Sequence, residues 1–195
     1  MMSIFKYFNT LVFVLLTFYS CSEDTEENIE IIDENHHVET SENMSIELIL
    51  AMEDHTEAVI ELDEQLNEKT NYGEDLSKLT ESEKTVLFIE NLEIEVNNGG
   101  FHQFYSNSSG DYSLETYEAL LTIGADSMAK IMNDANSIWP NKTIPSNRTE
   151  RINILEEHED QLWDKWEECD SKFYEYPDDL IELLYTFISK NKADF

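Results

Sequence analysis

Residues that break helices and residues that carry positive charge are both scarce in this sequence. It contains five glycines and three prolines, and 12 lysines and arginines stand against 43 aspartates and glutamates, for a formal net charge of −31. So few glycines and prolines argue against a fold rich in turns. So little positive charge argues against direct binding to nucleic acid or to anionic lipid headgroups, because their phosphates would be repelled. A partner that binds through charge should therefore be a basic protein.

Cysteine is also scarce, since only Cys21 and Cys169 occur. If the thiol of Cys21 is modified, Cys169 is left alone and no intramolecular disulfide can form, so the core must hold the fold without a crosslink. Hydrophobic residues make up 41% of the chain and aromatic residues 11%. That apolar content argues for a folded core rather than a disordered acidic chain. Cys169 falls on an apolar helical stripe, and we expect it to be buried and inert.

The first 20 residues differ from the rest of the chain. Lys6 is their only charged residue, and Leu11–Tyr19 forms an apolar run that is too short to span a bilayer. A small residue and then Cys21 follow this run, which resembles the lipobox of bacterial lipoproteins, although Phe18 stands where leucine is usual. We therefore predict a signal peptide over residues 1–20 and lipidation of Cys21. An ordinary secretory signal and an uncleaved anchor are the alternatives.

Lipidation would place the protein in the cell envelope, either in the periplasm or at the outer-membrane surface. The lipid anchor would be its only contact with the membrane, and a chain whose signal is not processed would stay in the cytoplasm. Residues 21–44 contain many acids and no lysine or arginine, which predicts an extended, flexible linker. The same acidic run resembles the surface-export signal of some Gram-negative lipoproteins, and a plain spacer is the other interpretation.

Residues 45–195 are predicted to form one compact all-α domain of about six helices, because apolar residues recur at helical spacing and strand signals are weak. Thr80 and Glu83 have the pattern of a capping box before an apolar run. The paired glycines Gly99 and Gly100 should end that helix, and Pro177 can occupy the first turn of the last helix. The expected helices span about 45–69, 80–97, 114–123, 127–136, 146–170 and 177–190.

The helix expected over 146–170 carries a row of acids opposite an apolar stripe that includes Leu155, Leu162, Trp163 and Trp166. Over about 27 Å of helix axis the row has about one carboxylate per 4 Å, close to the roughly 3.4 Å between phosphates of a DNA strand. It is either a solvated helix face or an imitation of a phosphate backbone that holds a basic protein. The acids of this row are Glu150, Glu156, Glu157, Asp160, Asp164, Glu167 and Glu168.

The segment from residue 95 to residue 110 is the most distinctive in the chain. Two glycines can redirect the backbone between helices without a Cβ penalty, and the aromatic residues that follow have the spacing of one buried helix face. The polar side chains could satisfy backbone groups around the turn, or they could line a pocket for a small ligand. The residues concerned are Glu95, Asn98, Gly99, Gly100, Phe101, Gln103, Asn107 and Gly110.

Together with a later Ile123-Gly124-Ala125, this segment resembles the bacterial DNA-mimic protein family. The resemblance implies an all-helical, non-enzymatic protein, and at least one member of the family occupies the DNA site of a transcription factor. That role belongs to the cytoplasm, whereas this chain carries an export-like N-terminus. The fold implied by the resemblance therefore transfers more readily than the biological role.

We find no catalytic motif in the sequence and predict no cofactor and no metal site. Glutamate is absent three residues before His55, His102 and His158, and no P-loop or Gly-x-Ser-x-Gly occurs. Three hypotheses follow. The first is an envelope lipoprotein that binds a basic protein, and the second is a cytosolic DNA mimic. The third is an enzyme or small-ligand binder with a polar pocket around Glu95, His102 and Gln103.

Overall fold

The computed structural model describes residues 43–73 and 75–195, so the predicted signal peptide, Cys21 and nearly all of the linker lie outside the described residues. The described part is helical and contains no strand, which confirms the all-α prediction. Its α-helices are α1 (Ile46–Ile49), α2 (His55–Lys69), α3 (Glu81–Ser106), α4 (Ser113–Ile123), α5 (Asp126–Ser137), α6 (Arg148–Phe173) and α7 (Leu180–Lys190).

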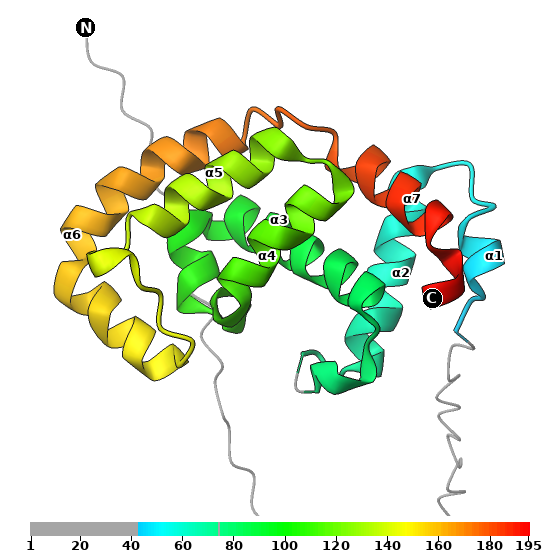
Figure 1. The fold of residues 1–195 in the computed structure, drawn as a ribbon, viewed down its shortest axis with the longest axis horizontal. Helices are drawn as coiled ribbons and strands as arrows, with labels where there is room; N and C mark the ends of the chain where they lie inside the picture. The colour runs from blue at the N-terminus through cyan, green and yellow to red at the C-terminus, as the bar shows by residue number, and fades with distance from the viewer. Residues whose placement is uncertain (1–42, 74) are drawn as a thin grey trace, which may run out of the picture. The chain divides into compact units, whose positions relative to one another are not determined.

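Helix α3 is the centre of the arrangement. It packs against α4 and α6 along one part of its length and against α2 along another, so that α4, α5 and α6 lie at one end and α1, α2 and α7 at the other (Figure 1). Most of its apolar residues are buried, among them Val86, Ile89, Leu92 and Val96, each with 0% of its surface exposed, whereas Ile94 is 48% exposed. Burial of this kind is the main source of stability for a domain without disulfides.

The first predicted helix, over residues 45–69, is wrong in one respect, because the structure has two helices separated by a break. Asp54 begins α2, and its Oδ1 accepts hydrogen bonds from the backbone N–H of Thr56 at 2.8 Å and of Glu57 at 3.4 Å. A carboxylate that satisfies two free N–H groups makes this position a favourable helix start. The break buries Ile49 and leaves Leu48 61% exposed, whereas the continuous helix would have placed Leu48 on the apolar side.

The start of α3 follows the sequence prediction. The Thr80 hydroxyl accepts from the Glu83 N–H at 3.1 Å, and the Glu83 carboxylate accepts from the Thr80 N–H at 2.9 Å, which completes a capping box. Lys69, at the end of α2, pairs with the same carboxylate at 2.7 Å. The cap therefore also connects α2 to α3.

Helix α6 begins where it was expected, with the Asn147 side chain accepting from the Glu150 N–H at 3.0 Å. His158 has non-helical dihedral angles, φ −121° and ψ 17°, and Figure 1 shows that the two parts of α6 run in different directions. The straight row of about 27 Å expected from the helical rise is therefore wrong. Leu155, Leu162 and Trp166 are buried as expected, but Trp163 is 50% exposed.

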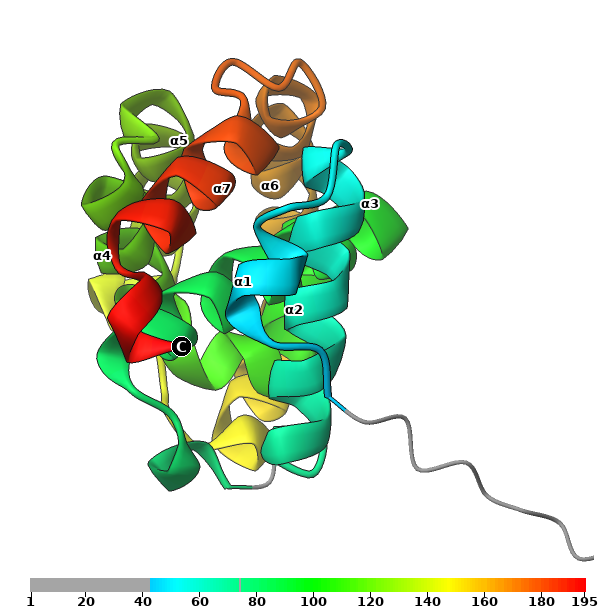
Figure 2. The ribbon, with the colours of Figure 1, turned by 90° about the vertical axis from the view of Figure 1, so that its right-hand side faces the viewer.

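Helix α7 begins at Leu180, after the position predicted from Pro177, because Asp179 supplies the cap by accepting from the Glu182 N–H at 3.2 Å. It packs against α2, and α1, α2 and α7 lie together in Figure 2. His55 stacks on Tyr185 with ring centroids 3.6 Å apart, and the Tyr185 hydroxyl donates to the Leu50 carbonyl at 2.7 Å.

In the part of the chain that the structure describes, no helix is both long and apolar enough to cross a membrane.

Candidate functional site

The paired glycines divide α3 into two helical segments that meet at a kink. Gly100 has φ +68° and ψ −174°, a combination that is essentially restricted to glycine. Gly99 and Gly100 both have non-helical dihedral angles, so the helix that begins at Glu81 is interrupted at the glycines, as predicted, and a second helical segment runs from Phe101 to Ser106. A Cβ atom on Gly100 would collide with the carboxylate of Asp170 on α6. The kink thus allows a close approach between α3 and α6.

The carboxylate of Asp170 caps the second part of α3. Its Oδ1 accepts a hydrogen bond from the Phe101 N–H at 2.7 Å. Burial raises the pKa of Asp170, and the bond from Phe101 opposes that shift. The aromatic residues that follow the cap, Phe101, Phe104 and Tyr105, are completely buried, as their spacing predicted.

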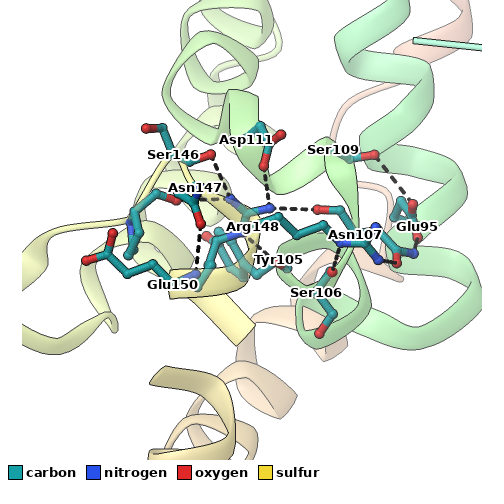
Figure 3. A network of polar contacts seen from close by, with 12 residues as sticks. Glu95, Tyr105, Ser106, Asn107, Ser109, Asp111, Ser146, Asn147, Arg148 and Glu150 are labelled. Carbon is teal, nitrogen blue, oxygen red and sulfur yellow. Dashed lines mark hydrogen bonds and ion pairs between the residues drawn. The ribbon is translucent and has the colours of Figure 1, made fainter. Parts of the chain in front are cut away.

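Glu95 organises the polar side chains of the motif. Its Oε2 accepts from the Gln103 amide at 2.7 Å and from the Asn107 amide at 2.8 Å, and its Oε1 accepts from the Ser109 hydroxyl at 3.4 Å (Figure 3). All three bonds join side chains across the kink, so the expectation that Glu95, Gln103 and Asn107 satisfy backbone groups is wrong for them. Sequence analysis missed Ser109, which a short polar run does not distinguish from a solvated turn.

Both arginines of the chain hold the end of α3. Arg151 is completely buried, and its guanidinium donates to the carbonyls of Tyr105 at 2.6 Å and Asn107 at 2.8 Å and to the Pro145 carbonyl at 2.9 Å. Its Nη2 also lies 2.6 Å from Asp111 Oδ1. The planar donor fork of arginine suits several acceptors at once. Sequence analysis did not identify Arg151, although an arginine beside the apolar stripe of an acidic helix is a signal worth testing.

Gly110 and Arg148 complete this arrangement, and Figure 3 shows Arg148 beside Ser106 and Asn107. A Cβ atom on Gly110 would lie 2.9 Å from Arg151 Nε and 2.8 Å from Tyr105 Cα, so the absence of a side chain makes room for the buried guanidinium. Arg148 is exposed and donates from its Nε to the Ser106 carbonyl at 2.9 Å and from its Nη2 to Asn107 Oδ1 at 3.2 Å.

Two polar residues of the motif region lie outside the Glu95 network. Asn98 is exposed, and its side chain forms no hydrogen bond with any residue that the structure describes. His102 is partly buried and lies against Trp163 with ring centroids 4.5 Å apart. Burial lowers the pKa of His102, although Glu159 opposes the shift. Trp163, which the apolar stripe predicted to be buried, is therefore covered in part by His102 and is otherwise exposed.

The acids of the predicted α6 row are exposed on both parts of the bent helix, namely Glu150, Glu156, Glu157, Asp164, Glu167 and Glu168. The side chain of Asp160 lies outside the described residues. Glu168 pairs with Lys172 at 2.8 Å. Among the described residues, Glu156, Glu157, Asp164 and Glu167 form no ion pair. The helix therefore offers unpaired carboxylates to solvent along a bent path.

A second group of acids is buried between α2 and α3, and sequence analysis missed it. Burial raises the pKa of Asp63 to about 6 and that of Glu90 to about 8, with nearby carboxylates adding to both shifts. Burial also raises the pKa of Glu93, which accepts from the Tyr176 hydroxyl at 3.0 Å. One carboxylate oxygen of each acid is buried without a hydrogen-bond partner in the described structure. No group of three or more metal-ligand side chains among the described residues is arranged to hold an ion.

These features define a class of protein, an acidic all-α domain built on a kinked central helix whose polar motif is tied to a buried arginine. The model of the family described as DMP19-like protein matches residues 77–191. This match covers more than half of the chain, and the chain belongs to the DMP19-like family. The resemblance seen in the motif is thereby confirmed. Comparisons with the curated proteins and with the solved structures gave no match.

Proposed function

We propose that this chain is a non-enzymatic acidic protein that binds a basic protein partner. The observation that carries the proposal is the set of exposed, unpaired carboxylates on α6, in a chain whose formal net charge is −31. Such a surface attracts a basic protein over a distance and accelerates its encounter. Membership of the DMP19-like family fits an acidic protein of the DNA-mimic kind.

We propose no catalytic role for the motif, because the Glu95 carboxylate is already engaged by Gln103, Asn107 and Ser109. A general base needs an accessible lone pair in reach of its substrate. The bonds around Glu95 instead support a role in holding the kinked helix against its neighbours.

The partner should be tested by its response to salt and to charge reversal. The immobilised protein is incubated with a cell extract, and bound proteins are eluted with a salt gradient. Interactions between exposed charges are screened beyond about 8 Å at physiological ionic strength, so a basic partner should elute at moderate salt. Glu156→Lys/Glu157→Lys should reduce its retention, whereas Glu64→Lys/Glu68→Lys on α2 controls for the same change in net charge. Retention that is independent of salt contradicts the proposal.

We further propose that the protein acts as an envelope lipoprotein anchored through Cys21. The support is the apolar run followed by a small residue and cysteine in the sequence. Labelled palmitate should enter the wild-type protein and not Cys21→Ala. Equal labelling of the two proteins removes the anchor from the proposal while leaving the acidic binding surface untouched.

A cytosolic DNA mimic that occupies the DNA site of a transcription factor is the second candidate, and membership of the DMP19-like family favours it. The two candidates differ in processing. A soluble, full-length protein in cell fractionation, together with the mass of an unprocessed N-terminus, selects the cytosolic mimic. A membrane-associated protein that begins at Cys21 selects the lipoprotein.

A further inference from the structure

A surface groove of about 1060 Å³ lies where the beginning of α3, the helix α4 and the end of α7 meet. Its apolar part includes Phe88 and Tyr112, which stack with ring centroids 5.1 Å apart, and Phe187 of α7. Leu114 also lines the groove and is 63% exposed. No residue of α6 lines it, so the groove and the acidic α6 surface are separate features.

The charged residues of the groove are mostly acidic. Glu81, Glu115 and Glu118 line it together with one cation, Lys84. Lys84 Nζ lies 2.7 Å from Glu81 Oε1, so its charge is already offset within the protein. Glu115 and Glu118 are three residues apart on α4 and therefore lie on the same side of that helix. The groove thus combines aromatic surface with two carboxylates that have no cation beside them among the described ion pairs.

This combination selects one kind of occupant. An anionic ligand would be repelled by the carboxylates, and the groove volume of about 1060 Å³ is slightly above the range of about 300–1,000 Å³ that is usual for small-molecule pockets. A helix or an extended segment with apolar side chains on one face and lysine or arginine beside them would match both the aromatic surface and the carboxylates. We infer that the groove binds an amphipathic basic segment of the partner, and this inference rests on the proposed function for the positive charge of that partner.

The two surfaces then have different roles in recognition. The exposed carboxylates of α6 act over a distance and increase the rate of encounter, an effect that salt weakens. The groove supplies apolar contact, which salt does not screen, and it therefore determines which basic segment stays bound. Leu114 is the best residue to test, because its exposure means that its replacement removes contact surface without opening the core.

The test uses two short fluorescent synthetic peptides and the full-length protein. One peptide has leucine and lysine in an amphipathic helical pattern, and the other has alanine in place of leucine. Leu114→Ser should weaken binding of the leucine peptide about tenfold, the loss expected for one apolar side chain contact, and should leave the alanine peptide unaffected. Glu115→Gln/Glu118→Gln should weaken binding of both peptides. Thr122→Trp, at an exposed groove position, should block the groove and weaken binding of the leucine peptide at least as much as Leu114→Ser.

The control is Glu156→Gln/Glu157→Gln on α6, which removes the same charge as the α4 double variant and should not alter the preference for leucine over alanine. If the leucine peptide binds Leu114→Ser and Thr122→Trp as tightly as it binds the wild type, the groove is not its site and the inference fails. If only the α6 variant loses binding of both peptides, the proposed function is supported and the inference about the groove fails. If the wild-type protein binds neither peptide, both the inference about the groove and the proposed function are contradicted.

Discussion

The backbone N–H of Phe101 donates a hydrogen bond to the carboxylate of Asp170 at 2.7 Å, although 69 residues separate the two in sequence. Met128, near the start of α5, donates in the same way to Asp178 at 2.8 Å across 50 residues. The residue before each helix start, Gly100 in one case and Ala125 in the other, has no polar side chain that could cap the helix. The free N–H groups of these helices are thus satisfied by aspartates that arrive from the C-terminal part of the chain.

Replacement of Gly100 tests the close approach of α3 to α6. Gly100→Ala should destabilise the protein by about 2–4 kcal/mol, because alanine is strained at this backbone conformation and its Cβ displaces the Asp170 cap. Gly124→Ala is the control. Gly124 also has a positive φ, +84°, but a Cβ there meets no atom within 4 Å, so only the backbone cost of about 1–2 kcal/mol applies. Urea unfolding measures both, and equal losses would show that the contact with Asp170 does not matter.

Arg151→Lys should destabilise the protein by about 3–5 kcal/mol, because an ammonium cannot reach the carbonyls and the carboxylate that the buried guanidinium joins. Arg148→Lys, three residues earlier and exposed, should cost less than about 1 kcal/mol. Thermal unfolding of the two variants is the measurement. A stable Arg151→Lys protein would mean that the end of α3 is held by its aromatic packing rather than by the arginine.

Glu95→Gln should cost about 1–3 kcal/mol, because the new amide presents donors to the side chains of Gln103 and Asn107. Asn98→Ser changes an exposed residue of the same motif and should stay within about 0.5 kcal/mol of the wild type. Chemical denaturation compares the two. Wild-type stability in Glu95→Gln would argue against a structural role for the network and would return attention to a ligand.

The stability of the domain should decrease as pH rises through the range from about 6 to about 8, because burial raises the pKa of Asp63 to about 6 and that of Glu90 to about 8. The folded protein keeps protons that the unfolded chain has released, so folding is favoured on the acid side. Where Glu90 is the only group whose protonation differs between the folded and the unfolded protein, the free energy of unfolding decreases by about 1.4 kcal/mol per pH unit.

Thermal unfolding across this pH range should show the decrease in the wild type and a smaller one in Glu90→Gln, whose side chain does not titrate. Glu68→Gln on the exposed surface of α2 controls for the loss of one carboxylate. Stability that rises with pH in the wild type would contradict this assignment of protonation states.

Sequence reasoning succeeded where the determinants are local. The capping box of Thr80 and Glu83, the start of α6 at Asn147 and the buried face of Phe101, Phe104 and Tyr105 all depend on residues within one or two helical turns. The starts of α4 and α5 also lie within a residue of their predicted positions. The all-α class follows from these local signals together with the scarcity of glycine and proline.

Sequence reasoning failed where a distant residue decides the structure. The helix after Gly100 resumes because Asp170 arrives from α6, a contact that no local pattern announces. The bend at His158 has no proline or glycine to mark it, and it breaks the straight row of acids. One further failure was local: Asp54 caps α2, and aspartate is a favoured N-cap residue, but the apolar spacing over residues 45–69 predicted a continuous helix. Glu90 directly follows the apolar run of residues 86–89, and this position is the sequence feature that indicates a buried carboxylate.

The placement of the described chain ends has a practical consequence for experiments. Residues 43–47 and Phe195 line the same small cavity, and α1 and the C-terminus lie at the same end of the domain, while the turn before α6 lies at the other end (Figure 1). A circular permutant that joins Phe195 to residue 43 through a short linker and opens between Asn141 and Ser146 should therefore fold. A reporter fused after Phe195 would crowd the end of α7, and one inserted between Asn141 and Ser146 would leave that end clear.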